Sequence, residues 1–349
     1  MGARCNPKAV RESFSNRRGG SGPEDAALLS GLKTFLGGGM RMLTLRLTGA
    51  ALATSCMLVL AQENIPVPTV SVQMTVTVEP RQEKVPELNQ EDVMVFQKDD
   101  RLRVTNLGPC RGEDSALELF VLIDDASGWS LGSQLNDIRQ FIETEPATTS
   151  IGIGYMRNAT VDILQGLTAD HTKAAKTLRL PFGSAGIMPS PFLSLSDLIK
   201  RWPASPARHE VVLVTSGVDP LGGGLANPYL DSAIEHAQRA GVIVYAIYTP
   251  SAGHFGHSFW RMNWGQNHLA QIAEETGGEA YMLGFGPPVS FAPYLTEVAE
   301  HLAHQYLVTF LIKPGDKAGF QAVRLTTEVP NAELLAASKV YVPAGTGSK

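Results

Sequence analysis

One segment of the sequence, LELFVLIDDASGWSLGSQLNDI, places acids and serines directly after an apolar run. An apolar strand that ends in Asp125 and Ser127, joined by a hydroxyl and a carboxylate from later loops, could supply hard oxygen ligands to Mg²⁺. The candidates from later loops are Ser190 and Asp219. The pattern therefore raises the hypothesis of an Mg²⁺ site, but Trp129 stands where a second serine would complete it.

The same segment contains GWSLG, which matches the G-x-S-x-G pattern of a serine nucleophile between a strand and a helix. Ser130 would be the nucleophile, followed in chain order by Asp219 and by His254 or His257. Two observations oppose a serine hydrolase. The motif follows the first strand of the α/β stretch, so the strands that normally precede such a serine are missing. The adjacent Asp-Asp pair would also place anions beside a developing oxyanion. Ser130 is equally suited to cap a helix.

A third candidate is the segment SAGHFGHSFWRMNWGQNH, which is rich in aromatic residues and histidines. No carboxylate is spaced with His254, His257 and His268 as a metal site would need. Exposed Trp260 and Trp264 would suit contact with another protein. Alternatively, these aromatic side chains fold back into a small satellite core, and the sequence leaves both interpretations open.

The order of predicted elements indicates how these residues are positioned. Several apolar runs, such as FVLI, VVLV and VIVYAIY, are typical of strands covered by helices on both faces. Strands alternate with helical patterns, which predicts an α/β fold with a doubly wound, mostly parallel sheet. Its strands are predicted at Leu117–Ile123, Ser150–Met156, Thr160–Leu164, Glu210–Thr215, Val242–Tyr248, Ala280–Leu283 and Tyr306–Ile312. Its helices are predicted at Ser130–Glu143, Asp170–Leu178, Ser194–Trp202, Pro228–Ala240, Gln266–Thr276 and Ala292–His304.

Shorter strand patterns flank this stretch on both sides. We expect an N-terminal β-module over residues 66–112, the α/β domain over 116–312, and C-terminal strands over 313–343. The C-terminal strands are expected to pack on the β-module or on the sheet edge, which would make a small antiparallel unit from the two ends of the chain.

The first part of the chain predicts export. Residues 40–61 have a positive start, a short apolar run and small residues at the end, as a cleaved signal peptide has. Residues 1–39 are then expected to be a mis-annotated or disordered leader. The apolar run is shorter than the roughly 20 residues of a membrane span, so no span is expected in the mature form. The net charge of −5 argues against nucleic acid as a partner.

The chain resembles the von Willebrand factor type A (VWFA) family, specifically the VWFA-related proteins of acidobacterial type. The resemblance rests on LELFVLIDDASGWSLGSQLNDIRQFI, PFLSLSDLIKRWP, HEVVLVTSGVDP and RAGVIVYAIY, and on the flanking β-segments. It implies a metal-ion-dependent adhesion site, for which Asp125 and Ser127 match. Trp129 replaces the second serine and Ser190 is the nearest hydroxyl to the expected threonine. Ser216 replaces an acid, so Asp219 would have to compensate.

We therefore expect an exported, non-enzymatic protein of adhesion or scaffold type, in the periplasm, the cell envelope or outside the cell. Its metal site is degenerate, so no cofactor is expected beyond weakly bound Mg²⁺, and its partner is another protein. An Mg²⁺-dependent ligand-binding domain and a serine hydrolase are the alternatives.

Overall fold

The computed structural model describes residues 69–80, 85–111, 116–252 and 258–344. The expected leader and signal peptide lie outside these residues, as do His254 and His257. Within them, no helix is both long enough and apolar enough to cross a membrane.

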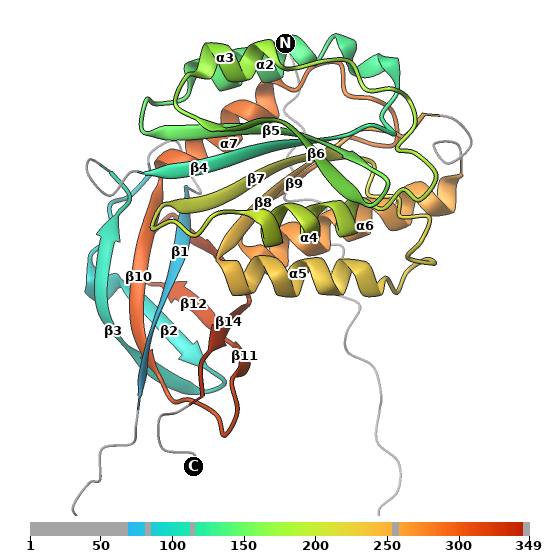
Figure 1. Ribbon diagram of the computed structural model, residues 1–349. Helices are drawn as coiled ribbons and strands as arrows, with labels where there is room; N and C mark the ends of the chain where they lie inside the picture. Colours follow the sequence, from blue (N-terminus) through green and yellow to red (C-terminus); the bar gives the residue numbers. More distant parts are fainter. Residues whose placement is uncertain (1–68, 81–84, 112–115, 253–257, 345–349) are drawn as a thin grey trace, which may run out of the picture. The chain divides into compact units, whose positions relative to one another are not determined.

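A six-stranded sheet forms the centre of the α/β part, in the order β6-β5-β4-β7-β8-β9 (Figure 1). All neighbouring strands are parallel except β5 and β6, which form an antiparallel hairpin. The order matches a doubly wound sheet whose chain direction switches between β4 and β7. The strands are β4 (Leu117–Asp124), β5 (Thr149–Arg157), β6 (Thr160–Thr168), β7 (Arg208–Thr215), β8 (Val242–Tyr248) and β9 (Ala280–Tyr281).

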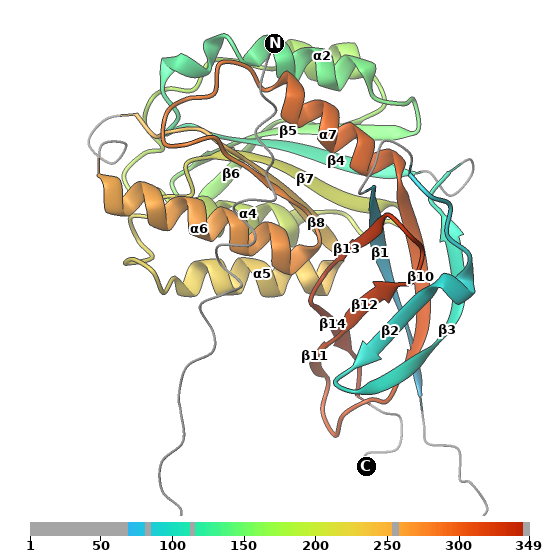
Figure 2. The same cartoon turned by 180° about the vertical axis from the view of Figure 1, so that it is seen from behind.

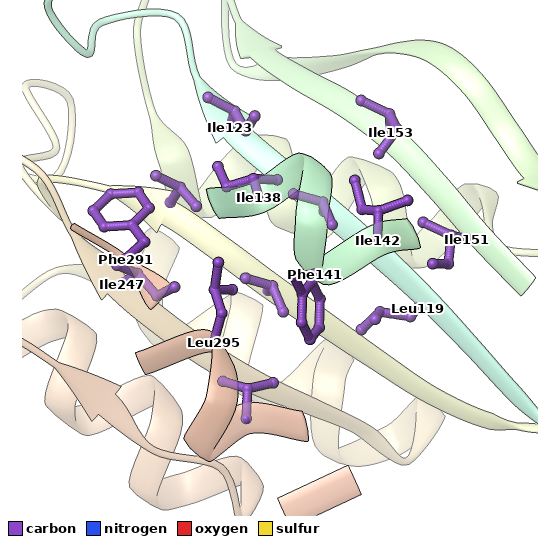
Figure 3. Close-up of a cluster of buried hydrophobic side chains, with 14 of the residues drawn as sticks. Leu119, Ile123, Ile138, Phe141, Ile142, Ile151, Ile153, Ile247, Phe291 and Leu295 are labelled. Atoms are coloured by element: carbon purple, nitrogen blue, oxygen red, sulfur yellow. The ribbon is translucent and has the colours of Figure 1, made fainter. Parts of the chain in front are cut away.

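Helices cover both faces of this sheet, as the apolar runs predict (Figures 1 and 2). Alternate strand residues such as Leu119 and Ile123 pack with Ile138 and Phe141 on one face (Figure 3). This face carries α2 (Leu135–Thr144), α3 (His171–Lys176) and α7 (Ala292–Ala303). The opposite face carries α4 (Pro191–Arg201), α5 (Pro228–Ala240) and α6 (Phe259–Thr276).

Strands from both ends of the chain form a second, antiparallel sheet in the order β12-β2-β3-β10-β1-β13. Its edge strands are consecutive in the sequence and joined by a short turn, so the sheet curls strongly (Figure 2). Its strands are β1 (Val70–Pro80), β2 (Val93–Gln97), β3 (Asp100–Pro109), β10 (Gln305–Ile312), β12 (Arg324–Thr327) and β13 (Ala332–Ala336), beside a separate pair of β11 (Gly319–Ala322) and β14 (Lys339–Val342).

Three expected element assignments are wrong. Strand β10 was expected at the end of the α/β domain, but it pairs with β1 and β3 in the antiparallel sheet. The helix expected from Ser130 is a short 3-10 helix over Trp129–Gly132, and α2 begins only at Leu135. Helix α6 begins at Phe259, so most of the segment predicted as an aromatic loop is helical.

Candidate functional site

A pocket opens at the carboxyl ends of β4, β5 and β7, beside the switch in strand order where doubly wound sheets bind ligands. Its cavity volume is about 240 Å³. Asp124, the last residue of β4, lines it together with Ala126, Arg157 and Ser190. Asp124 and Arg157 are the charged residues among its lining residues in the described part of the chain.

The Asp124 carboxylate is buried and hydrogen-bonded to its neighbours. The Thr215 hydroxyl donates to Oδ2 at 2.6 Å, and the Ala126 backbone N–H donates to Oδ1 at 2.8 Å. Burial raises the pKa of Asp124 from 3.8 to about 6, although both hydrogen bonds lower it, and the nearby Asp125 and Asp219 raise it further. The charged form therefore prevails at neutral pH, but the group takes up a proton in mild acid.

Asp125, the expected metal ligand, is instead engaged in a buried ion pair. Adjacent strand-end residues point to opposite sides, so Asp125 lies away from the pocket that Asp124 lines. Arg179 donates to both of its oxygens, at 2.7 and 2.9 Å, and the Phe182 N–H donates at 3.3 Å. The Arg179 guanidinium lies between the rings of Tyr155 and Phe182, 3.8 and 4.0 Å from their centroids. Both oxygens of Asp125, the ligand expected from the sequence, are therefore bound by Arg179, and Asp124 is the strand-end carboxylate that lines the pocket.

Ser127, the second expected ligand, is buried and is not among the residues that line the pocket. Its hydroxyl has no hydrogen-bond partner among the described residues. Its backbone N–H donates to the Asp124 carbonyl at 2.9 Å. The backbone of Ser127 thus helps to close the turn after β4.

Ser190 and Asp219, expected from two separate loops, do meet. The Ser190 hydroxyl donates to Asp219 Oδ2 at 2.7 Å and accepts from the Leu193 N–H, which caps α4. Asp219 also accepts from the N–H groups of Leu221 and Gly222. A further bond comes from the side chain of Asn227 at 3.3 Å. Asp219 therefore organises the loop after β7.

These contacts limit what the pocket can do chemically. One carboxylate, Asp124, faces the pocket, and Ala126 beside it offers no side-chain oxygen for Mg²⁺. The Ser216 hydroxyl pairs with that of Ser251 at 2.6 Å. The described donors to Asp219 are Ser190, Leu221, Gly222 and Asn227. The histidines proposed for a hydrolase, His254 and His257, lie outside the described residues. Ser130 lies within the 3-10 helix that follows the turn.

The aromatic segment divides into an exposed and a packed part. Trp260, in the first turn of α6, is 67% exposed. Trp264 is half-buried, and a methyl group on Gly224 would lie 3.6 Å from its ring. His268 is buried and its Nε2 lies 3.3 Å from the Leu225 carbonyl oxygen. Trp264 therefore packs against the loop of Gly224, whereas Trp260 is exposed and its contact with a partner stays a prediction.

Exposed apolar side chains gather around the pocket. Among the described residues, Leu164 is the only strongly exposed large hydrophobic residue that lies within a strand. The others lie in loops or first helical turns at the carboxyl end of the parallel strands. We call this surface the carboxyl-end face; its exposed hydrophobic residues are Trp129, Leu180, Phe182, Ile187, Met188, Leu225, Phe259, Trp260, Leu283 and Val289.

The loop that carries several of these residues is fixed to the β5–β6 hairpin. The Asn158 side chain accepts from the Ile187 N–H at 2.8 Å, and the Asn158 N–H donates to the Ala185 carbonyl at 2.7 Å. Gly186 has φ +91°, and a Cβ there would lie 2.0 Å from Asn158 Oδ1. Only glycine permits this close approach. The two hydrogen bonds of Asn158 thus fix the loop that carries exposed Ile187 and Met188.

No protein-family model matches the sequence, and no curated protein matches it. The fold is similar to that of an aerotolerance-related membrane protein from Bacteroides fragilis, with 12% identity, a TM-score of 0.40, and coverage of 54% of this chain and 98% of that one. The VWA domain of SpRpn10 gives 13% identity, a TM-score of 0.35, and coverage of 52% and 95%. The pilus adhesin SpaC from Lactobacillus rhamnosus GG gives 9% identity, a TM-score of 0.41, and coverage of 72% and 48%.

Proposed function

We propose that this chain is an exported, non-enzymatic protein of the VWFA type that binds another protein through its carboxyl-end face. The single observation that carries the proposal is the concentration of exposed Trp129, Phe182, Ile187 and Met188 around the pocket of Asp124. Exposed apolar patches with polar surroundings are typical of protein-interaction surfaces. The VWFA assignment is supported by the strand order and by the sequence resemblance, and export is supported by residues 40–61.

The size of the pocket favours a protein partner over a small molecule. Its 240 Å³ lies below the about 300–1,000 Å³ of typical small-molecule sites. A protein side chain inserted into such a pocket, with aromatic residues around it, is the usual arrangement of a binding hot spot. We propose that one partner side chain enters beside Asp124 while the rim residues exclude water.

Binding is proposed to proceed without tightly held Mg²⁺. Mg²⁺ sheds its water reluctantly and needs several charged or neutral oxygen ligands in near-octahedral geometry. The pocket offers one carboxylate, already bonded to Thr215 and Ala126. The site is thus a remnant of a metal site, and the rim supplies the binding energy.

The rim can be tested by capture of an envelope partner. Trp129→Ala combined with Phe182→Ala is expected to weaken retention of the specific partner by at least about tenfold, because hot-spot aromatic residues contribute about 2 kcal/mol or more each. Retention is measured by quantitative mass spectrometry of native envelope fractions passed over immobilised protein. Leu164→Ala, an exposed apolar residue on β6 outside the face, is the matched control. Equal retention by all three proteins would refute the proposal.

A further inference from the structure

A second cluster of potential ligands lies where α7 leads into the antiparallel sheet (Figure 2). Glu297 and His301 lie on α7, and Glu279 directly precedes β9. One ligand atom from each of the three residues lies within 4.8 Å of the other two. His301 Nε2 is 3.9 Å from Glu279 Oε2. The cluster belongs to the helix-covered edge of the sheet and is separate from the pocket at Asp124.

His301 is held in position for coordination. The residue is 4% exposed, and its ring lies 5.9 Å from the Tyr245 ring, centroid to centroid. Its Nδ1 lies 3.5 Å from the Tyr281 hydroxyl, an outer contact of the kind that orients metal-binding histidines. The other ring nitrogen, Nε2, lies on the side of the Glu279 carboxylate, 3.9 Å from its Oε2.

The carboxylates concentrate negative charge at the same point. Glu297 is one helical turn from His301, so both side chains lie on one face of α7. A bound cation would offset the repulsion between the Glu297 and Glu279 carboxylates.

We propose that His301, Glu297 and Glu279 form a structural site for a divalent transition metal of the Zn²⁺ type, with water completing the coordination. An imidazole with two carboxylates is a ligand set that Zn²⁺ accepts and that Mg²⁺ seldom takes. In a tetrahedral site, Zn–ligand bonds of about 2.0–2.2 Å place two ligand atoms about 3.4 Å apart. Ligand atoms that lie up to 4.8 Å apart here would therefore have to approach one another by up to about 1.4 Å. The metal would join β9 to α7, the helix that continues into the antiparallel sheet. This inference does not rest on the proposed function.

The test is a calorimetric titration of the chelator-treated full chain with Zn²⁺, in parallel with Glu297→Gln and His301→Gln. We expect the wild-type protein to bind one equivalent that each variant binds at least about tenfold more weakly, and we expect excess Mg²⁺ not to displace it. Circular dichroism establishes that each variant is folded. If His301→Gln fails to fold, the wild type is compared with Glu297→Gln alone, because Glu297 is only half-buried.

Glu300→Gln provides the matched control, because Glu300 is exposed on the same helix and is not part of the cluster. It is expected to bind Zn²⁺ like the wild type, and bound Co²⁺ should give visible absorption that Glu297→Gln loses. Adventitious Zn²⁺ on other histidines would appear equally in every variant. The same stoichiometry and affinity in wild type, Glu297→Gln and Glu300→Gln would overturn the site.

Discussion

Arg179→Ala is expected to lower the free energy of unfolding by about 3–5 kcal/mol, the usual cost of leaving a buried partner charge unpaired. Arg179 binds both carboxylate oxygens of Asp125, whose side chain is 1% exposed. Without Arg179, the remaining polar contact of Asp125 with this loop would be the Phe182 N–H at 3.3 Å. The substitution also removes the guanidinium that packs on Tyr155 and Phe182.

Chemical denaturation at neutral pH measures this loss. Arg157→Ala is the matched control, because Arg157 is exposed and lies over the same Phe182 ring at 5.2 Å without pairing with Asp125. The double variant Asp125→Asn with Arg179→Ala should recover part of the loss, since no unpaired buried charge remains. A loss for Arg179→Ala no greater than for Arg157→Ala would show that the pair does not stabilise the fold.

Glu145→Gln is expected to stabilise the protein above neutral pH by up to about 3 kcal/mol and to have little effect near pH 5. Burial, and then the charge of Glu210, raises the pKa of Glu145 from 4.5 to about 7. Burial likewise raises the pKa of Glu210 to about 7, although Arg208 lowers it. Between about pH 4.5 and pH 7 the folded state therefore binds more protons than the unfolded state. The free energy of unfolding falls as the pH rises through this range. Glutamine remains neutral and removes the contribution of Glu145.

The measurement is the free energy of unfolding of wild type and variant from pH 5 to about pH 8. Taking the difference cancels the titration of histidines common to both proteins. Glu143→Gln, on the exposed side of the same helix end, is the matched control for replacing a glutamate by glutamine. A flat difference for Glu145→Gln would mean that its carboxyl group titrates alike in the folded and unfolded states.

The alternation of elements was readable from the sequence because buried parallel strands are continuous apolar runs, such as VVLV and VIVYAIY. The same continuity concealed which of Asp124 and Asp125 faces the pocket, since a strand buried on both faces has no polar alternation to fix its orientation. Only the structure places Thr215 on Asp124 and Arg179 on Asp125. Arg179 lies far along the chain and no local pattern marks it.

The sheet assignment of β10 and the predicted start of α6 were wrong for a related reason. Strand β10 follows α7 as any strand of the α/β alternation would, and its sheet is decided by distant pairing with β1 and β3. The early start of α6 was missed because Phe259 and Trp260 follow a stretch rich in glycine and histidine. Ser190 and Asp219, which the sequence names as candidate site residues from two loops, do meet, because loops after parallel strands gather at one edge.

Hydrogen exchange of the complex in the presence of a chelator tests most directly whether the carboxyl-end face binds a protein without a metal ion. The captured partner is added to the full chain, and backbone exchange is compared with that of the free protein. We expect slower exchange in residues 126–132 and 179–189, with no change in the antiparallel sheet. A footprint on the antiparallel sheet, or the loss of protection when the chelator is added, would contradict it.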